Sequence, residues 1–226
     1  MKKGKFLDTN IINKSKTVES KIQLFEHNGV MLPLPTEIEI SESGTCNRTC
    51  SFCPRSASDF VDKKEFISNS LHEKLCLELK DLNYKGTIRY SGFVEPLLDV
   101  NIYNLISMVK KNLPECNVEM VTNGDPLNPK RLNKLFESGL DKILISAYDG
   151  KEDADKLEDL CVSANLTKEQ YIVRHRYYSE EQDFGITLSN RSGLMENAEF
   201  KIESLKEPLK KPCYIPSYTF FLDYQG

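Results

Sequence analysis

The stretch Val118-Glu119-Met120-Val121-Thr122-Asn123-Gly124 is typical of a β-strand that ends in a turn, because apolar and β-branched residues give way to an Asn-Gly pair. Pro129 then begins a helical pattern. Its apolar residues, which recur on one face, are Leu132, Leu135 and Phe136. Lys142-Ile143-Leu144-Ile145-Ser146 is the next predicted strand. A strand, a helix and a strand in this order predict one parallel βα unit.

The same alternation extends outward in both directions. Further strands are predicted over residues 36–41, 87–90, 171–178 and 218–222, and further helices over residues 67–82, 102–113 and 151–161. Such a series predicts an α/β protein with either a partial barrel or a doubly wound parallel sheet. Residues 1–34 are predicted to form an N-terminal extension, and the polar residues 179–211 a loop or connector.

The composition excludes several classes of protein. The 226 residues carry 30 Lys and Arg against 34 Asp and Glu, so neither nucleic acid nor a membrane is expected as a partner. With 39% hydrophobic residues the chain is expected to form a core rather than to stay disordered. No apolar run suits a membrane span, and the N-terminus lacks the apolar segment of a secretory signal. The 7 cysteines, an odd number, favour the cytoplasm over a disulfide framework.

Three cysteines stand close together, with the spacing Cys-x3-Cys-x2-Cys at Cys46, Cys50 and Cys53. Three thiolates on one loop can hold three corners of a cubic iron–sulfur cluster and leave one iron without a protein ligand. An open coordination position is what a catalytic metal centre needs. The alternative is a zinc site, for which no fourth ligand follows at zinc-finger spacing, although His72 and Cys76 on the next helix remain candidates.

This motif resembles the signature of the radical S-adenosylmethionine (radical SAM) superfamily, and the aromatic residue Phe52 directly before the last cysteine also matches. Three further segments are similar to family motifs and follow in the expected order. They are Ser91-Gly92-Phe93-Val94-Glu95-Pro96-Leu97-Leu98, Thr122-Asn123-Gly124 and Ile145-Ser146-Ala147-Tyr148-Asp149-Gly150. The resemblance covers about residues 36–226. It implies a partial (β/α)6 TIM-like barrel, with residues 35–226 as the radical SAM core.

The resemblance also implies the cofactors and the chemistry. A 4Fe–4S cluster would be held by Cys46, Cys50 and Cys53, and S-adenosylmethionine would chelate the open iron through its amine and carboxylate. The reduced cluster would pass one electron to the sulfonium, and the resulting 5′-deoxyadenosyl radical would abstract hydrogen from an organic substrate, a peptide or a small metabolite. The electron would come from a donor such as flavodoxin or ferredoxin.

The resemblance assigns roles around this cofactor as well. Phe52 would pack against the adenine, or else belong to the ordinary core. Glu95 would accept the ammonium of the methionine moiety, with a surface carboxylate as the alternative. Gly92 would let the backbone turn close to the ligand. Phe93 and Val94 depart from the family pattern, which usually has at least one glycine at these two positions.

Further along the chain, the resemblance places polar residues at strand ends. Thr122 and Asn123 would read polar groups of the cofactor, although Asn-Gly is also a common turn. Ser146 would meet the ribose or the carboxylate, or only satisfy the backbone. Arg174 or Arg176 would pair with the carboxylate if their shared face points inward.

The C-terminal residues 211–226 resemble the opening of the SPASM or twitch extension that one subgroup carries. Cys213 alone cannot hold an auxiliary cluster, which needs about four thiolates, so a truncated or lost extension is expected. Two other classes stay open: a non-catalytic iron–sulfur or zinc protein, and an inactive fragment of a longer enzyme.

Overall fold

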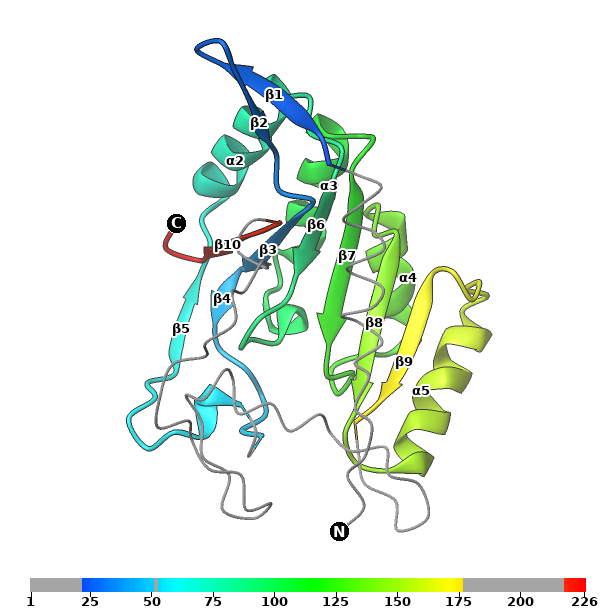
Figure 1. The fold of residues 1–226 in the computed structure, drawn as a ribbon. Helices are drawn as coiled ribbons and strands as arrows, with labels where there is room; N and C mark the ends of the chain where they lie inside the picture. Colours follow the sequence, from blue (N-terminus) through cyan, green and yellow to red (C-terminus); the bar gives the residue numbers. More distant parts are fainter. Residues whose placement is uncertain (1–21, 51–52, 177–217) are drawn as a thin grey trace, which may run out of the picture.

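The computed structural model describes residues 22–50, 53–176 and 218–226. Its main element is a sheet of 6 strands in the order β10-β3-β6-β7-β8-β9, and every neighbouring pair is parallel (Figure 1). The strands are β3 (Glu37–Ser41), β6 (Thr87–Tyr90), β7 (Asn117–Thr122), β8 (Lys142–Ala147), β9 (Tyr171–His175) and β10 (Thr219–Asp223). The predicted parallel α/β fold is confirmed.

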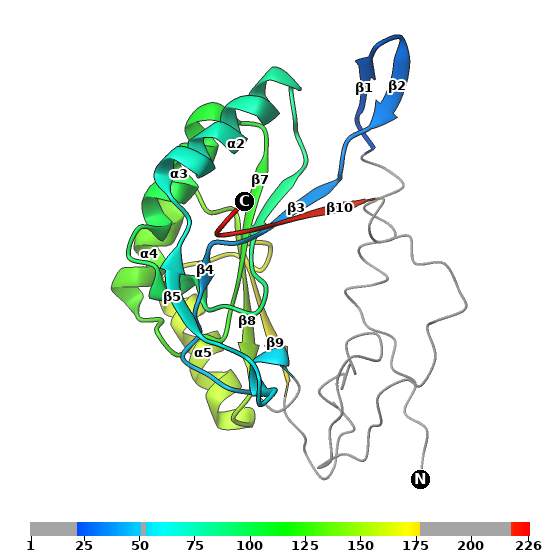
Figure 2. The same cartoon turned by 90° about the vertical axis from the view of Figure 1, so that its left-hand side faces the viewer.

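Four helices connect or follow these strands. They are α2 (Asn69–Asp81), α3 (Ile102–Asn112), α4 (Pro129–Glu137) and α5 (Lys151–Ser163). All four lie on the same side of the sheet (Figure 2). A doubly wound sheet carries helices on both faces, whereas the helices of the described residues cover one face, so their arrangement is that of a partial TIM-like barrel and not of a doubly wound sheet.

Helix α4 shows how local sequence fixes these elements. The Asn128 side chain accepts a hydrogen bond from the backbone N–H of Arg131 and caps the helix, and Pro129 stands in its first turn. Leu132 and Leu135 are fully buried against the core. Each such leucine contributes about 1.5–3 kcal/mol to folding.

The core lies between the sheet and the helices. β7 alternates, with Val118, Met120 and Thr122 buried and the residues between them half-buried, as a strand with one covered face should. β8 is buried along both faces after its first residue. The carboxyl ends of β6, β7 and β8 therefore emerge side by side from a fixed core, and they position the polar residues that follow them.

Two strand predictions need correction at their ends. The strand predicted over 171–178 ends at His175, and residues 177 and 178 lie outside the described residues. The strand predicted over 218–222 forms β10, which pairs with β3 through the register Thr219↔Glu37, at the edge opposite β9. Phe220 and Phe221 in this edge strand are 49% and 52% exposed.

Two small antiparallel units were not predicted. β1 (Leu24–His27) and β2 (Val30–Pro33) form a hairpin that projects beyond the sheet (Figure 2). Its turn residues Asn28 and Gly29 both have positive φ, which is the usual two-residue hairpin turn. β4 (Ser43–Gly44) pairs with β5 (Lys63–Phe66). The division of the chain into an N-terminal extension (residues 1–34) and a core (residues 35–226) stays a prediction.

Candidate active site

The three clustered cysteines lie in and around the loop that follows β4. Cys46, Cys50 and Cys53 are half-buried, and all three line one pocket. Burial raises the pKa of Cys50 to about 11, so a metal would have to displace the thiol protons as it binds. The described residues contain no group of three or more His, Cys, Asp or Glu side chains that could hold a single metal ion.

Glu95 reaches the same pocket from the loop after β6. Glu95 is 1% exposed, so the alternative prediction that it is a surface carboxylate is wrong. Oε1 accepts hydrogen bonds from the Thr122 hydroxyl at 2.6 Å and from the Leu97 backbone N–H at 3.1 Å. Oε2 accepts one from the Asn123 backbone N–H at 2.7 Å. Burial raises the pKa of Glu95, and these three donors oppose that shift.

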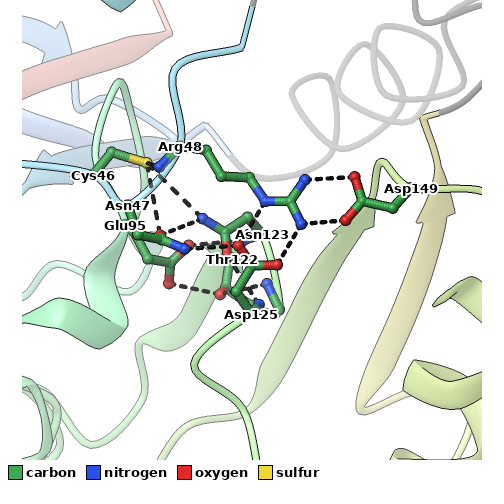
Figure 3. A network of polar contacts seen from close by, with 9 residues as sticks. Cys46, Asn47, Arg48, Glu95, Thr122, Asn123, Asp125 and Asp149 are labelled. Carbon is green, nitrogen blue, oxygen red and sulfur yellow. Dashed lines mark hydrogen bonds and ion pairs between the residues drawn. The ribbon is translucent and has the colours of Figure 1, made fainter.

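These contacts give Thr122 and Asn123 a function beyond their turn. Both bind Glu95, and the Asn123 amide also donates to Asn47 Oδ1 at 2.8 Å and contacts Cys46 Sγ at 3.9 Å. Asn123 therefore links the buried carboxylate to the cysteine loop, as Figure 3 shows. Asn123 and Gly124 also form the predicted Asn-Gly turn, because Gly124 adopts a φ of 84°.

Gly92 stands where a side chain would not fit. Its φ is 125°, and a Cβ on it would lie 1.9 Å from Ser41 Oγ. Ser41 Oγ in turn donates to the Ser91 carbonyl at 2.8 Å. Glycine thus lets the loop after β6 approach β3. Phe93 and Val94, which replace the expected glycine, line the pocket.

The predicted residues of β8 and β9 are only partly brought together. Arg174 and Ser146 are register partners, and Arg174 Nη2 donates to Ser146 Oγ at 2.8 Å. Ser146 lines the pocket, but among the described lining residues there is neither Arg174 nor Arg176. Arg176 follows β9, and its backbone N–H donates to the Ala147 carbonyl. Phe52 and Cys213 lie outside the described residues.

Other charged residues at the pocket were not predicted. Arg48, inside the cysteine motif, forms ion pairs with Asp125 and Asp149, which follow β7 and β8 (Figure 3). Arg55, two residues after the last cysteine, is buried and donates to the Phe93 carbonyl. The sequence features that could have indicated these ion pairs are the basic residues in the cysteine loop and the acidic residues just after the strand ends.

A comparison with protein families decides the family. Residues 40–189 match the model of the radical SAM superfamily. The chain belongs to the radical SAM superfamily. The resemblance inferred from the cysteine motif is therefore confirmed.

A curated protein and a solved structure are similar to this radical SAM chain. It is 31% identical over 161 residues to the S-adenosyl-L-methionine-dependent 2-deoxy-scyllo-inosamine dehydrogenase of Niallia circulans, covering 71% of this chain and 60% of that protein. The crystal structure of BtrN in complex with AdoMet and 2-DOIA matches with a TM-score of 0.68 at 28% identity. This match covers 87% of the chain and 72% of BtrN.

Weaker matches agree with this assignment. BtrN in an open conformation matches with a TM-score of 0.50 at 27% identity, over 66% of this chain and 58% of that one. The GTP 3′,8-cyclase of Paenarthrobacter nicotinovorans is 26% identical over 118 residues, 49% of this chain and 31% of the cyclase. The matched part of this chain therefore covers less than two thirds of the length of each of these two curated relatives.

Radical SAM proteins use a 4Fe–4S cluster and S-adenosylmethionine, and the residues of this pocket fit both. Thiolate sulfur is the donor that iron–sulfur clusters require, and three thiols from one loop face the pocket. Each carboxylate oxygen accepts about two hydrogen bonds, and among the described residues Oε2 of Glu95 has one partner. One acceptor position therefore remains for a cationic group.

Proposed function

We propose that this chain is a radical SAM enzyme that abstracts hydrogen from a small organic metabolite. When bound, the 4Fe–4S cluster supplies the electron that cleaves S-adenosylmethionine. The observation that carries the proposal is one pocket, at the carboxyl ends of parallel strands, lined by three thiols of one loop and a buried carboxylate. Ligands of such sheets bind at this end of the strands.

The residues of the pocket have separate proposed roles in binding the two cofactors. Cys46, Cys50 and Cys53 would hold the cluster. Oε2 of Glu95 would accept the ammonium of S-adenosylmethionine, with the Asn123 N–H keeping the carboxylate oriented. Bringing an ammonium beside this buried carboxylate would favour its ionised form, against the desolvation that now raises its pKa.

Three other proposed contacts concern the rest of S-adenosylmethionine. Ser146 presents its hydroxyl to the pocket, and Arg174 bonds to that hydroxyl, so the pair could meet a carboxylate or a ribose. Arg176 would have to turn toward the pocket to share this task. Phe52 would cover the adenine, in keeping with its place directly before Cys53.

The substrate class is proposed from the relatives. The Niallia circulans protein is an S-adenosyl-L-methionine-dependent dehydrogenase of a small molecule, 2-deoxy-scyllo-inosamine. This favours a small metabolite over a peptide as the substrate of the present chain.

We further propose that a reductant such as flavodoxin or ferredoxin supplies the electrons and that the protein acts in the cytoplasm. No helix among the described residues is long and apolar enough to cross a membrane.

Anaerobic reconstitution with iron and sulfide tests this proposal. We expect the reduced chain to give an electron paramagnetic resonance (EPR) signal of a 4Fe–4S cluster, and S-adenosylmethionine to change that signal because it binds the open iron. A chain that takes up zinc but no iron would support the zinc alternative. A cluster whose signal does not respond to S-adenosylmethionine would support a non-catalytic iron–sulfur protein.

A further inference from the structure

Arg48 lies at the centre of the loop that carries the cysteines, two residues after Cys46 and two before Cys50. Its guanidinium points away from the Cys46 sulfur and toward Asp125 and Asp149, in the loops that follow β7 and β8 (Figure 3). Its side chain is 20% exposed. A cation in this position can hold the neighbouring loops in place through its contacts with their acidic side chains.

The guanidinium is bound along two of its edges. Nε and Nη2 donate to the two oxygens of Asp125 at 2.6 and 2.5 Å. Nη1 and Nη2 donate to the two oxygens of Asp149 at 2.8 and 2.6 Å. Such paired bonds between arginine and a carboxylate are directional as well as strong, so they fix orientation and not only distance.

Neighbouring contacts extend this arrangement to the cysteine sulfur. The Asn47 amide donates to Asp125 Oδ2 at 2.7 Å, so two consecutive loop residues bind one carboxylate. The Arg48 backbone N–H donates to Cys46 Sγ at 3.5 Å. Fixing the Arg48 side chain therefore also fixes the backbone donor that contacts a cysteine sulfur, and donors to cluster sulfurs influence the reduction potential.

We propose that Arg48, Asp125 and Asp149 form a clamp that positions the cysteine loop on the carboxyl ends of β7 and β8. The part of this inference that concerns the cluster rests on the proposed function. Arg48 acts as a positioning residue, because its hydrogen bond to Cys46 Sγ comes from its backbone N–H while its guanidinium binds the two aspartates. The clamp keeps Cys46 and Cys50 at a fixed place relative to Glu95, whose partners are Thr122, the last residue of β7, and Asn123 in the loop that continues to Asp125.

Variants can separate this geometry from charge. Arg48→Lys keeps the positive charge but cannot form the paired bonds, and Asp125→Asn keeps the shape but removes one carboxylate. Asp149→Asn affects a side chain that is 59% exposed, so the fold should tolerate it. Lys85→Met is the matched control, since it removes an ion pair with Glu115 elsewhere in the chain.

The first measurement is amide hydrogen exchange on the full, metal-free chain. We expect peptides covering residues 45–50 to exchange at least about tenfold faster in Arg48→Lys and Asp125→Asn, because the loop opens locally more often. Asp149→Asn should give a smaller increase, and Lys85→Met none. Loop exchange at the wild-type rate in both Arg48→Lys and Asp125→Asn would overturn the clamp.

The second measurement is made on the reconstituted chain and records the EPR line shape and the rate of iron loss to a chelator. We expect Arg48→Lys and Asp125→Asn to change both in the same direction, although their charge changes differ. Opposite shifts, or wild-type values in both, would overturn the positioning role. Failure of the wild-type chain to bind iron would instead contradict the proposed function, and the exchange measurement would still decide whether the clamp orders the loop.

Discussion

Thr122 Oγ1 donates a 2.6 Å hydrogen bond to Oε1 of Glu95. Thr122 is the last residue of β7, and Glu95 belongs to the loop after β6, so the bond joins the end of one strand to the neighbouring loop, and both residues line the pocket. Because Thr122 is 2% and Glu95 1% exposed, the bond is shielded from water. It holds a carboxylate, buried and already bonded by three donors, in one orientation next to the cysteine loop.

Replacing this carboxylate should weaken cofactor binding. In Glu95→Gln an amide N–H replaces one acceptor, so one of the present donors loses its partner and the ammonium loses its anion. We expect S-adenosylmethionine to bind more weakly by about 1.5–3 kcal/mol, measured by titration of the reconstituted chain. Iron content should stay at the wild-type level.

The control for this variant is Glu115→Gln, which neutralises an exposed carboxylate far from the pocket, in the ion pair with Lys85. Thermal unfolding of both variants separates lost binding from lost folding. Equal affinity for S-adenosylmethionine in Glu95→Gln and the wild type would remove Glu95 from the cofactor site.

Each clustered cysteine should be needed for the cluster. We expect Cys46→Ala, Cys50→Ala and Cys53→Ala to lose the visible absorption at about 400 nm, because two thiolates of one loop cannot hold the cube. Cys76→Ala and Cys116→Ala, which remove buried thiols outside the pocket, serve as controls and should retain it. A full complement of iron in the Cys50 variant would refute the ligand assignment.

Gly92 should tolerate no side chain. In Gly92→Ala the new Cβ would meet Ser41 Oγ at 1.9 Å and would sit on a backbone with a φ of 125°. Strain of this kind costs about 1–3 kcal/mol of folding free energy, which urea unfolding measures. The double variant Gly92→Ala with Ser41→Ala removes the clash but not the strained φ, so it should recover part of the loss. Wild-type stability of Gly92→Ala would show that the loop simply shifts.

Glu42 should make stability fall as the pH rises from 4.5 to about 8. It is fully buried, with Asp99 and Glu95 as charged neighbours, and burial raises its pKa from 4.5 to about 8. Between these two values the folded state keeps a proton that the unfolded state has lost. Stability therefore falls as the pH rises through this window, by at most about 1.4 kcal/mol per pH unit.

Glu42→Gln removes this titration and should flatten the dependence. Urea unfolding of the wild type and the variant at about pH 5 and pH 8 measures the difference. We expect the variant to lose less stability between the two pH values. Identical slopes would mean that Glu42 does not hold a proton in the folded state.

The parts of the fold that follow from local patterns could be predicted from the sequence. The βα alternation and the cysteine motif depend on residues close together in the chain. The Asn28-Gly29 turn of the hairpin also has a local signal, because Asn-Gly is the residue pair that favours positive φ at both positions.

Long-range pairing could not be predicted in the same way. Arg48 meets Asp125 and Asp149 across 77 and 101 positions of sequence, and no local pattern indicates such partners. The pairing of β10 with β3 brings Thr219 beside Glu37, which lies far away in the sequence, and no local pattern indicates this partner. The burial of Glu95 likewise follows from the neighbouring loops that close over it.

We propose that this pocket cleaves S-adenosylmethionine reductively with a cluster held by Cys46, Cys50 and Cys53. The most direct test incubates the reconstituted chain with S-adenosylmethionine and a strong reductant without oxygen, and measures 5′-deoxyadenosine and methionine by mass spectrometry. We expect both products in equal amounts from the wild-type chain and neither from Cys50→Ala. Absence of 5′-deoxyadenosine from a wild-type chain that carries a reducible 4Fe–4S cluster would contradict it.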